Sequence, residues 1–114
     1  MDGYIYRLVG SEVVAHEGLD MTGRRAGYSE ARYGHLVAEW LGALDFVRIN
    51  QIPRLVFVHF PQEVKAKNIV LLLLLHVAPG EAPKILVGSF YKGHFEPGTK
   101  VEGISVLEVA MKPD

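Results

Sequence analysis

The chain has 114 residues, of which 49% are hydrophobic and 22% charged, so it suits one domain with one core, and we expect a single domain over residues 1–114. Twelve Lys and Arg against thirteen Asp and Glu leave a net charge of −1, which argues against a generally basic surface for duplex DNA or an anionic membrane. The absence of cysteine excludes disulfides and thiolate chemistry and, with no basic-then-apolar leader, is typical of a cytoplasmic protein.

The first apolar segments predict β-structure. GYIYRLV at residues 3–9 is typical of a strand, and EVVAH at 12–16 indicates a further strand or the second half of a bent one. A glycine-rich loop with two arginines, LDMTGRRAGY, follows at residues 19–28. It leads into a helical pattern, so we expect its side chains to lie near the start of that helix.

A long amphipathic helix is predicted over Glu30–Val47. Ser29 is a suitable N-cap, Glu30 lies beside the positive end of the helix dipole, and Pro53 closes the region. Gly34 and Gly42 weaken a helix by about 1 kcal/mol each relative to Ala, so they indicate close packing against a broad partner such as a sheet. Apolar residues recur at three- and four-residue spacing on one side, at Tyr33, Leu36, Val37, Trp40, Leu41, Leu44 and Val47.

The chain after Pro53 is predicted to form strands throughout. Turns that contain Pro and Gly separate these strands, and such short connections indicate antiparallel neighbours. With the first strand they predict an α+β fold, in which one long helix packs on a bent antiparallel sheet of about five strands in the order β-α-β-β-β-β. The four segments, all rich in β-branched and aromatic residues, are 54–60, 68–77, 84–95 and 99–111.

Two of these strands are apolar on both faces. Leu55–Val58 and Ile69–Leu75 have apolar residues at odd and even positions, whereas a strand with one solvated face alternates. One helix covers one face only, so the other face meets a second subunit or the sheet closes into a barrel. The position of the helix after the first strand disfavours a barrel of the oligonucleotide-binding kind. We therefore expect a homodimer, face-to-face or edge-to-edge, or a homotetramer made of two such dimers.

The loop before the helix carries a short motif. DMTG, from Asp20 to Gly23, is similar to the Asp-x-x-Gly that hot-dog-fold thioesterases of the 4-hydroxybenzoyl-CoA thioesterase family have between first strand and helix. Together with the predicted order of elements, it makes the chain resemble this family over most of its length. The resemblance implies a hydrolase that acts on an acyl-CoA or acyl-carrier-protein thioester without a cofactor, with Asp20 as nucleophile or general base. Arg24 stands where members of the family commonly have His.

The same loop suits acyl transfer on physical grounds. Free backbone N–H groups at the helix start, around Gly27–Glu30, would stabilise a developing oxyanion. The loop glycines let backbone approach a ligand closely, and the arginines would contact the phosphates of coenzyme A or an acidic carrier protein. The plainer interpretation, in which Asp20 caps a turn and the arginines are solvated, stays open. The predicted substrate-binding residues are Gly23, Arg24, Arg25, Gly27, Tyr28 and Trp40.

Other kinds of chemistry have weaker support. GHFEPGTKVEGISVLE at 93–108 resembles the Gly-His-Phe segment of β-hydroxyacyl-ACP dehydratases, also hot-dog proteins, and this resemblance would pair His94 with Glu108. The five histidines show no metal-ligand spacing, so no metal is expected, and the longest apolar run, 69–75, is far short of the roughly 20 residues that span a membrane. The second hypothesis is a non-catalytic binding or assembly protein that uses the sheet for a small apolar ligand, a protein partner or single-stranded nucleic acid, with nucleic acid the least favoured.

Overall fold

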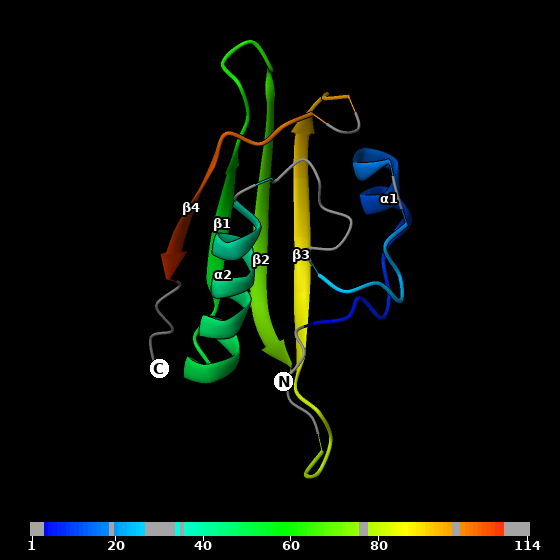
Figure 1. Cartoon of the computed structure of the whole chain (residues 1–114), viewed down its shortest axis with the longest axis vertical. Helices are drawn as coiled ribbons and strands as arrows, with labels where there is room; N and C mark the ends of the chain where they lie inside the picture. The colour runs from blue at the N-terminus through cyan, green and yellow to red at the C-terminus, as the bar shows by residue number, and fades with distance from the viewer. Residues whose placement is uncertain are drawn as a thin grey trace.

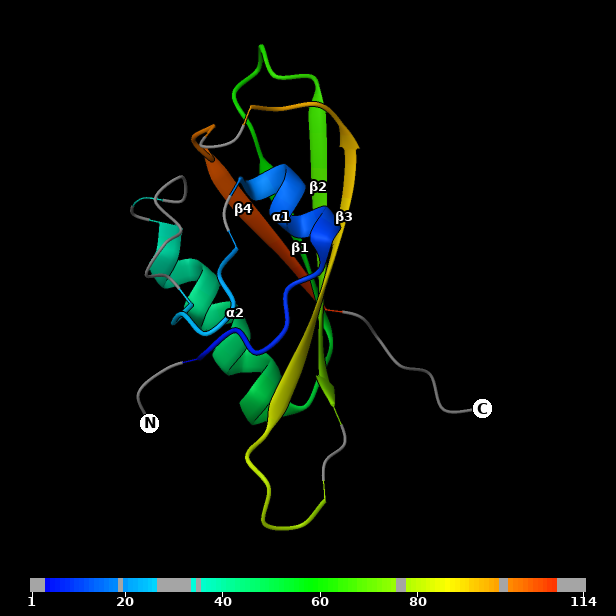
Figure 2. The same cartoon turned by 90° about the vertical axis from the view of Figure 1, so that its right-hand side faces the viewer.

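The structure, a computed structural model, describes residues 4–18, 20–26, 34, 36–75, 78–96 and 99–108. Its elements follow in the order α1 (Ser11–Glu17), α2 (Val37–Asn50), β1 (Arg54–His59), β2 (Ala66–Leu75), β3 (Lys84–Gly93) and β4 (Gly103–Glu108) (Figure 1). Seen from the side, the helices form one layer and the sheet another (Figure 2). The fold is therefore α+β, as the sequence predicts.

The strands form one antiparallel sheet in the order β3-β2-β1-β4. Hairpins join β1 to β2 and β2 to β3, because each of these pairs is consecutive in the chain (Figure 1). β3 and β4 are the two edges, so the sheet is open and is not a closed barrel. The described part of the chain has four strands rather than the five that the sequence predicts.

β4 pairs with β1 and not with β3, the strand that precedes it. The sequence prediction of antiparallel neighbours is wrong at this connection, because the chain crosses the end of the sheet to the far edge (Figure 1). Phe95 and Val101, which are 4% and 6% exposed, are buried along the crossover. The Glu102 N–H then donates to the carbonyl of His59 at 2.8 Å, where the pairing with β1 begins. Burial of these two side chains thus favours the crossover from β3 to β4, which the Pro and Gly residues of the turn do not predict.

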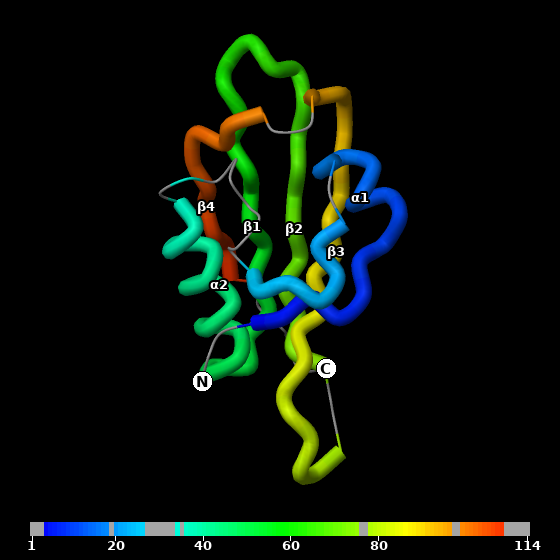
Figure 3. The backbone as a smooth tube through the Cα atoms, turned by 45° about the vertical axis from the view of Figure 1, so that its right-hand side comes forward, coloured from blue at the N-terminus to red at the C-terminus, as the bar shows by residue number. Residues whose placement is uncertain are grey.

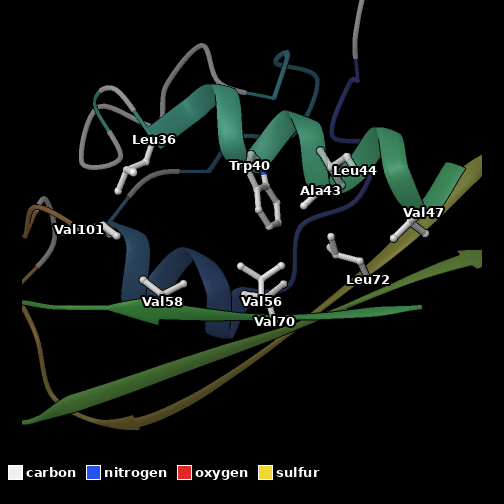
Figure 4. Close-up of a cluster of buried hydrophobic side chains, with 10 residues drawn as sticks. All are labelled: Leu36, Trp40, Ala43, Leu44, Val47, Val56, Val58, Val70, Leu72 and Val101. Carbon is white, nitrogen blue, oxygen red and sulfur yellow. The ribbon is translucent and has the colours of Figure 1, made fainter. Parts of the chain in front are cut away.

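The core lies between α2 and one face of the sheet. Trp40 points from the helix toward Val56 and Val70 at the centre of that face (Figure 4). Full burial of each Val or Leu side chain contributes about 1.5–3 kcal/mol of stabilising free energy. Burial of this cluster therefore holds the helix layer on the sheet. Its members, all less than a tenth exposed, are Leu36, Trp40, Ala43, Leu44, Val47, Val56, Val58, Val70, Leu72 and Val101.

α2 begins and ends later than the predicted helix Glu30–Val47. Residues 30–33 lie outside the described part of the chain, and Gly34 has a φ of +52°, which a right-handed helix does not contain. The helix continues to Asn50, after which Gln51 forms a left-handed cap whose N–H donates to the Val47 carbonyl at 3.0 Å. The close packing predicted at Gly34 and Gly42 is wrong, because an added methyl group at either glycine would meet nothing in the described chain within 4 Å.

The first segments differ most from the sequence prediction. The predicted strand at 12–16 is helix α1, which runs between Gly10 and Gly18, and Gly18 caps it with a left-handed φ of 78°. The predicted strand at 3–9 forms only an isolated bridge within its described part, between Ile5 and Arg25. Residues 4–6 therefore lie beside residues 24–26 and not in the sheet (Figure 3).

Both described helices lie on the same side of the sheet (Figure 2). We call the opposite side, which no described segment covers, the outer face. Its apolar character confirms the prediction that strands β1 and β2 are apolar on both faces. By alternation from the core positions, the outer face carries Leu55, Phe57, Ile69, Leu71, Leu73, Leu75, Leu86, Phe90 and Leu107.

Neither described helix is long and apolar enough to cross a membrane.

Candidate functional site

A cavity of about 100 Å³ lies on the helix side of the sheet, between α1, α2 and strands β2 and β3. Trp40 of α2 forms one wall, and Val13 of α1 faces it from the other helix. The segment before α1 forms the rim, where Leu8 is 91% exposed. The cavity is therefore mostly apolar and reaches solvent along the N-terminal segment.

The register of β2 and β3 brings polar groups to this cavity. Asn68 is paired with Tyr91, and Val70 is paired with Ser89, so Asn68 and Ser89 are diagonal neighbours on the same face. All of these side chains line the cavity. Polar groups that converge in a concave apolar site are typical of small-molecule binding sites.

Among the described residues, Asn68 is the one polar residue that is buried, at 2% exposure. Its Nδ2 donates to the carbonyl of Phe90 at 3.1 Å, which orients the amide so that Oδ1 is the other polar atom. Within the described part of the chain neither this Oδ1 nor the hydroxyl of Ser89 makes a hydrogen bond. The cavity thus offers the acceptor of a mostly buried side chain beside a hydroxyl that donates or accepts.

α1 is held against β3 by its last turn. The Tyr91 hydroxyl donates to Oε2 of Glu17 at 3.0 Å, and the ring of His16 stacks on Tyr91 with centroids 3.9 Å apart and planes within 2°. The Nδ1–H of His16 donates to the Glu12 carbonyl at 2.8 Å, since a carbonyl oxygen only accepts. Phe95 of the crossover closes the aromatic group at 6.0 Å from both rings. These contacts position one wall of the cavity.

The N-terminal segment is attached to α2 by a second polar group. The Tyr4 hydroxyl donates to Oδ1 of Asp45 at 2.6 Å and accepts from Nε of Arg48 at 3.1 Å. Partial burial is the main cause that raises the pKa of Tyr4, and the hydrogen bond to Asp45 adds to it. The bond to Tyr4 also raises the pKa of Arg48. The rim of the cavity is therefore anchored to the same helix that carries Trp40.

Asp20, the predicted catalytic residue, is an exposed side chain in a turn. Its Oδ1 accepts from Oγ1 of Thr22 at 2.7 Å and from the Thr22 N–H at 3.0 Å. These bonds, the side-chain one foremost, lower the pKa of Asp20. The following residue, Met21, is 8% exposed and lines the cavity. Asp20 therefore caps the turn that delivers Met21 to the cavity wall.

The predicted binding residues are only partly brought together. Trp40 lines the cavity at 4% exposure, whereas Gly23, Arg24 and Arg25 are exposed and lie outside its lining. Gly23 has a φ of +83°, and its N–H donates to the Tyr6 carbonyl at 2.6 Å, so it shapes the turn. The predicted residues Gly27 and Tyr28 lie outside the described part of the chain.

The residues of the dehydratase-like pattern are separated. His94 follows β3 at one end of the sheet and contacts Glu96 at 3.1 Å with both side chains exposed. Glu108 ends β4 on the opposite edge and pairs with Arg54 at 3.3 Å. Within the described residues, no group of three or more His, Cys, Asp or Glu side chains is placed to hold a metal ion.

The sequence did contain a signal for Asn68 and Ser89. Asn68 is the polar residue that opens the apolar run from Ile69 to Leu75, and Ser89 interrupts the apolar pattern of β3. Their proximity depends on the strand register, which the sequence does not give.

Comparison of the chain with protein-family models, with curated proteins and with solved structures gave no match. A function for this chain is therefore inferred from the geometry of the cavity.

Proposed function

We propose that this chain is a binding protein for a small, uncharged molecule that carries a hydrogen-bonding group on an apolar body. The ligand would occupy the cavity between α1, Trp40 and strands β2 and β3. The observation that carries this proposal is Asn68, whose Oδ1 has no hydrogen-bond partner among the described residues although the side chain is 2% exposed. Because little water reaches this side chain, a ligand donor that hydrogen-bonds to Oδ1 would be favoured.

The lining restricts the charge of the ligand. Among the described residues that line the cavity, Glu17 is the one charged side chain. A carboxylate or phosphate on the ligand would meet no cation there and would lie near this acid, so an anionic group is disfavoured. An alcohol or an amide satisfies both Oδ1 of Asn68 and the hydroxyl of Ser89, because each carries a donor and an acceptor.

The volume restricts its size. A cavity of roughly 150 Å³ accommodates benzene. The present cavity, of about 100 Å³, is smaller and suits a ligand of a few heavy atoms or the end group of a longer one. The apolar body would contact Val70, Val87 and Trp40, while a longer chain would leave along the rim at Leu8.

A titration followed by NMR tests the proposal. Butanol, isobutyramide and N-methylacetamide are the probes, and butyrate is the anionic comparison. We expect shifts at Asn68, Ser89 and Val87 with the neutral probes and weaker ones with butyrate. Ser89→Ala should weaken binding by about 2–10-fold, the loss of one neutral hydrogen bond. The matched control is Ser105→Ala, which removes an exposed hydroxyl that bonds to His59 at 2.6 Å. Equal affinity of both serine variants, or no shift at the cavity residues, contradicts the proposal.

Thioester hydrolysis is the second candidate. What favours it is that Asp20 directly precedes Met21, a residue of the cavity wall. In this candidate the fold is a hot-dog fold, Asp20 is the nucleophile or general base, an acyl-CoA or acyl-carrier protein is the substrate, and the protein is a cytoplasmic homodimer or homotetramer. A panel of acyl-CoA substrates with a thiol-release readout separates it from binding alone. Asp20→Asn should abolish turnover while Glu63→Gln, an exposed acid in the β1–β2 hairpin, retains it; unchanged turnover in Asp20→Asn excludes the role.

A further inference from the structure

We propose that the outer face of the sheet is covered by the same face of a second copy of this chain, in a two-fold symmetric homodimer. The proposal goes beyond ligand binding in the cavity and does not depend on it, since α1 and α2, which line the cavity, lie on the side of the sheet opposite the outer face (Figure 2). A sheet with one solvated face should carry polar residues on that face. Here the outer face carries nine apolar side chains, and its polar ones, three lysines with His59 and Ser105, lie toward the strand ends and the β4 edge.

The apolar surface extends across the whole width of the sheet. Phe90 on edge strand β3 is 61% exposed, and Leu107 on edge strand β4 is 56% exposed. Leu55 and Leu71 lie between them on β1 and β2, paired with each other in the register. Monomeric proteins rarely leave a continuous apolar surface of this kind in water.

The surface is also flat enough for a partner. Gly88 lies in the row of Leu71, and the Phe90 ring lies over it, with Cε2 3.6 Å from the position that a Gly88 side chain would take. The ring therefore fills the gap that the glycine leaves. A continuous layer of apolar side chains is what two sheets need to pack face to face at about 10 Å.

The area agrees with that of a stable interface. Strands β2 and β3 have 10 residues each, so at roughly 3.3 Å per residue the face is about 33 Å long. Strands β1 and β4 have 6 residues each and are about 20 Å long, so at a spacing of about 4.8 Å the four strands cover roughly 500 Å² in projection. Stable dimers bury about 800 Å² of accessible surface per partner, which is the same scale.

The distribution of charge favours a second copy over a nucleic acid. Lys67 and Lys92 lie opposite each other at one end of the outer face, and Lys84 lies at the other end of β3. The lysines therefore lie at both ends of an apolar centre, and charged groups at the margin are the usual anatomy of a protein interface. A surface that stacks bases relies on aromatic rings. The outer face has two phenylalanines against six leucines, and the chain has a net charge of −1.

A symmetric pair closes on itself. Two-fold interfaces use the same patch on both copies, so the apolar centre of each face is covered and no apolar surface is left for a third copy. The lysines at the two ends then remain at the margin, in water. The interiors of homodimer interfaces are more apolar than other interfaces, as this face is.

Sedimentation velocity over a range of protein concentrations tests the proposal. We expect the wild-type protein to sediment as a dimer at micromolar concentration. Phe90→Glu and Leu107→Glu each place a charge in the apolar surface, on different edge strands, and each should raise the dissociation constant by roughly thirtyfold or more. The matched control is Ile49→Glu on α2, because Ile49 is 64% exposed but lies away from the outer face. This variant should remain a dimer.

Circular dichroism establishes that each variant is folded, and a variant that loses its native spectrum is replaced by the other one. A wild-type protein that is monomeric throughout the concentration range overturns the proposal. So do two folded face variants that remain dimeric, since the contact must then lie elsewhere, such as the β3 edge. A monomer that is retained on single-stranded DNA overturns it in favour of an oligonucleotide on the outer face.

Discussion

Two glycines of the chain have opposite roles, although the sequence presents them alike. Gly42 lies on the exposed side of α2, and a side chain there would meet nothing within 4 Å. Gly93 ends β3 with a φ of +80°, and a side chain there would collide with the carbonyl oxygen of Lys65, the residue before β2. A glycine in the sequence shows only that the backbone can adopt a positive φ at that position. The structure shows that Gly93 adopts one and that Gly42 does not.

These glycines give the first prediction. Gly42→Ala should raise the free energy of unfolding by about 1 kcal/mol, because alanine restricts the unfolded chain and favours helix. Gly93→Ala should lower it by about 2 kcal/mol or more, because the left-handed conformation and the collision with Lys65 both oppose a side chain. Urea denaturation of the two variants measures both changes. Equal effects of the two substitutions would contradict the assignment.

The turn at Asp20 gives the second prediction. Hydrogen bonds from Thr22 lower the pKa of the Asp20 carboxyl, so the folded state holds it ionised more strongly than the unfolded state does. Such a carboxyl contributes stability above its ordinary pKa, of about 4, and this contribution is lost as the pH falls through the lower folded value. Thr22→Val removes the larger of the two bonds and should raise the pKa of Asp20 toward its ordinary value.

The measurement for this prediction is an NMR titration of the Asp20 carboxyl carbon. Thr99→Val is the control, because its hydroxyl bonds to the Glu96 carbonyl in a separate turn and its loss should leave the pKa of Asp20 unchanged. If Thr22→Val also leaves the titration unchanged, the turn does not hold the carboxylate in solution. That result would contradict the interpretation that Asp20 caps this turn.

At the scale of elements, long apolar patterns are sufficient to predict helices and strands, whereas short segments are not. Strands β1 to β3 and the apolar face of α2 follow from runs of residues whose period is clear. α1 was missed because Val13 and Val14 favour strand, and a helix of seven residues has too few turns to display a period. Its flanking glycines, Gly10 and Gly18, were the signal in the sequence.

Packing against β3, rather than propensity, must therefore hold α1, and this gives the third prediction. Tyr91→Phe removes the hydrogen bond to Glu17 while keeping the ring that stacks on His16. The free energy that keeps α1 closed should fall by about 1 kcal/mol, so its amides should exchange about fivefold faster with deuterium. Tyr4→Phe is the matched control, since the Tyr4 hydroxyl bonds to α2 instead. Equal exchange of the α1 amides in both variants would show that Tyr91 does not hold this helix.

At the scale of the whole molecule, the sequence predicted layers but not their connection. Apolar residues on both faces of β1 and β2 predicted that the helix covers one face and a second subunit the other. The structure shows an open sheet with the core on the helix side, and the cover of the outer face stays a prediction. The crossing of the chain from β3 to the far edge, and the cavity formed where α1, α2 and the sheet meet, depend on contacts between residues distant in sequence. Asn68 and Ser89 meet only because β2 and β3 pair in one particular register.

The outer face gives the last prediction, which concerns the stability of the whole molecule. If a second copy covers this face, folding is coupled to association, and the wild-type melting temperature should rise with protein concentration. Ile49→Glu should keep this dependence, because Ile49 lies on α2 away from the outer face. Phe90→Glu should abolish it and should melt at the temperature of the separated chain. Differential scanning calorimetry over a roughly hundredfold range of protein concentration measures the melting temperatures of the three proteins. A change of about 1 kcal/mol shifts the melting temperature by a few degrees, which the method resolves. A wild-type melting temperature that does not change with concentration would mean that the nine apolar side chains of the outer face are stable in water without a partner.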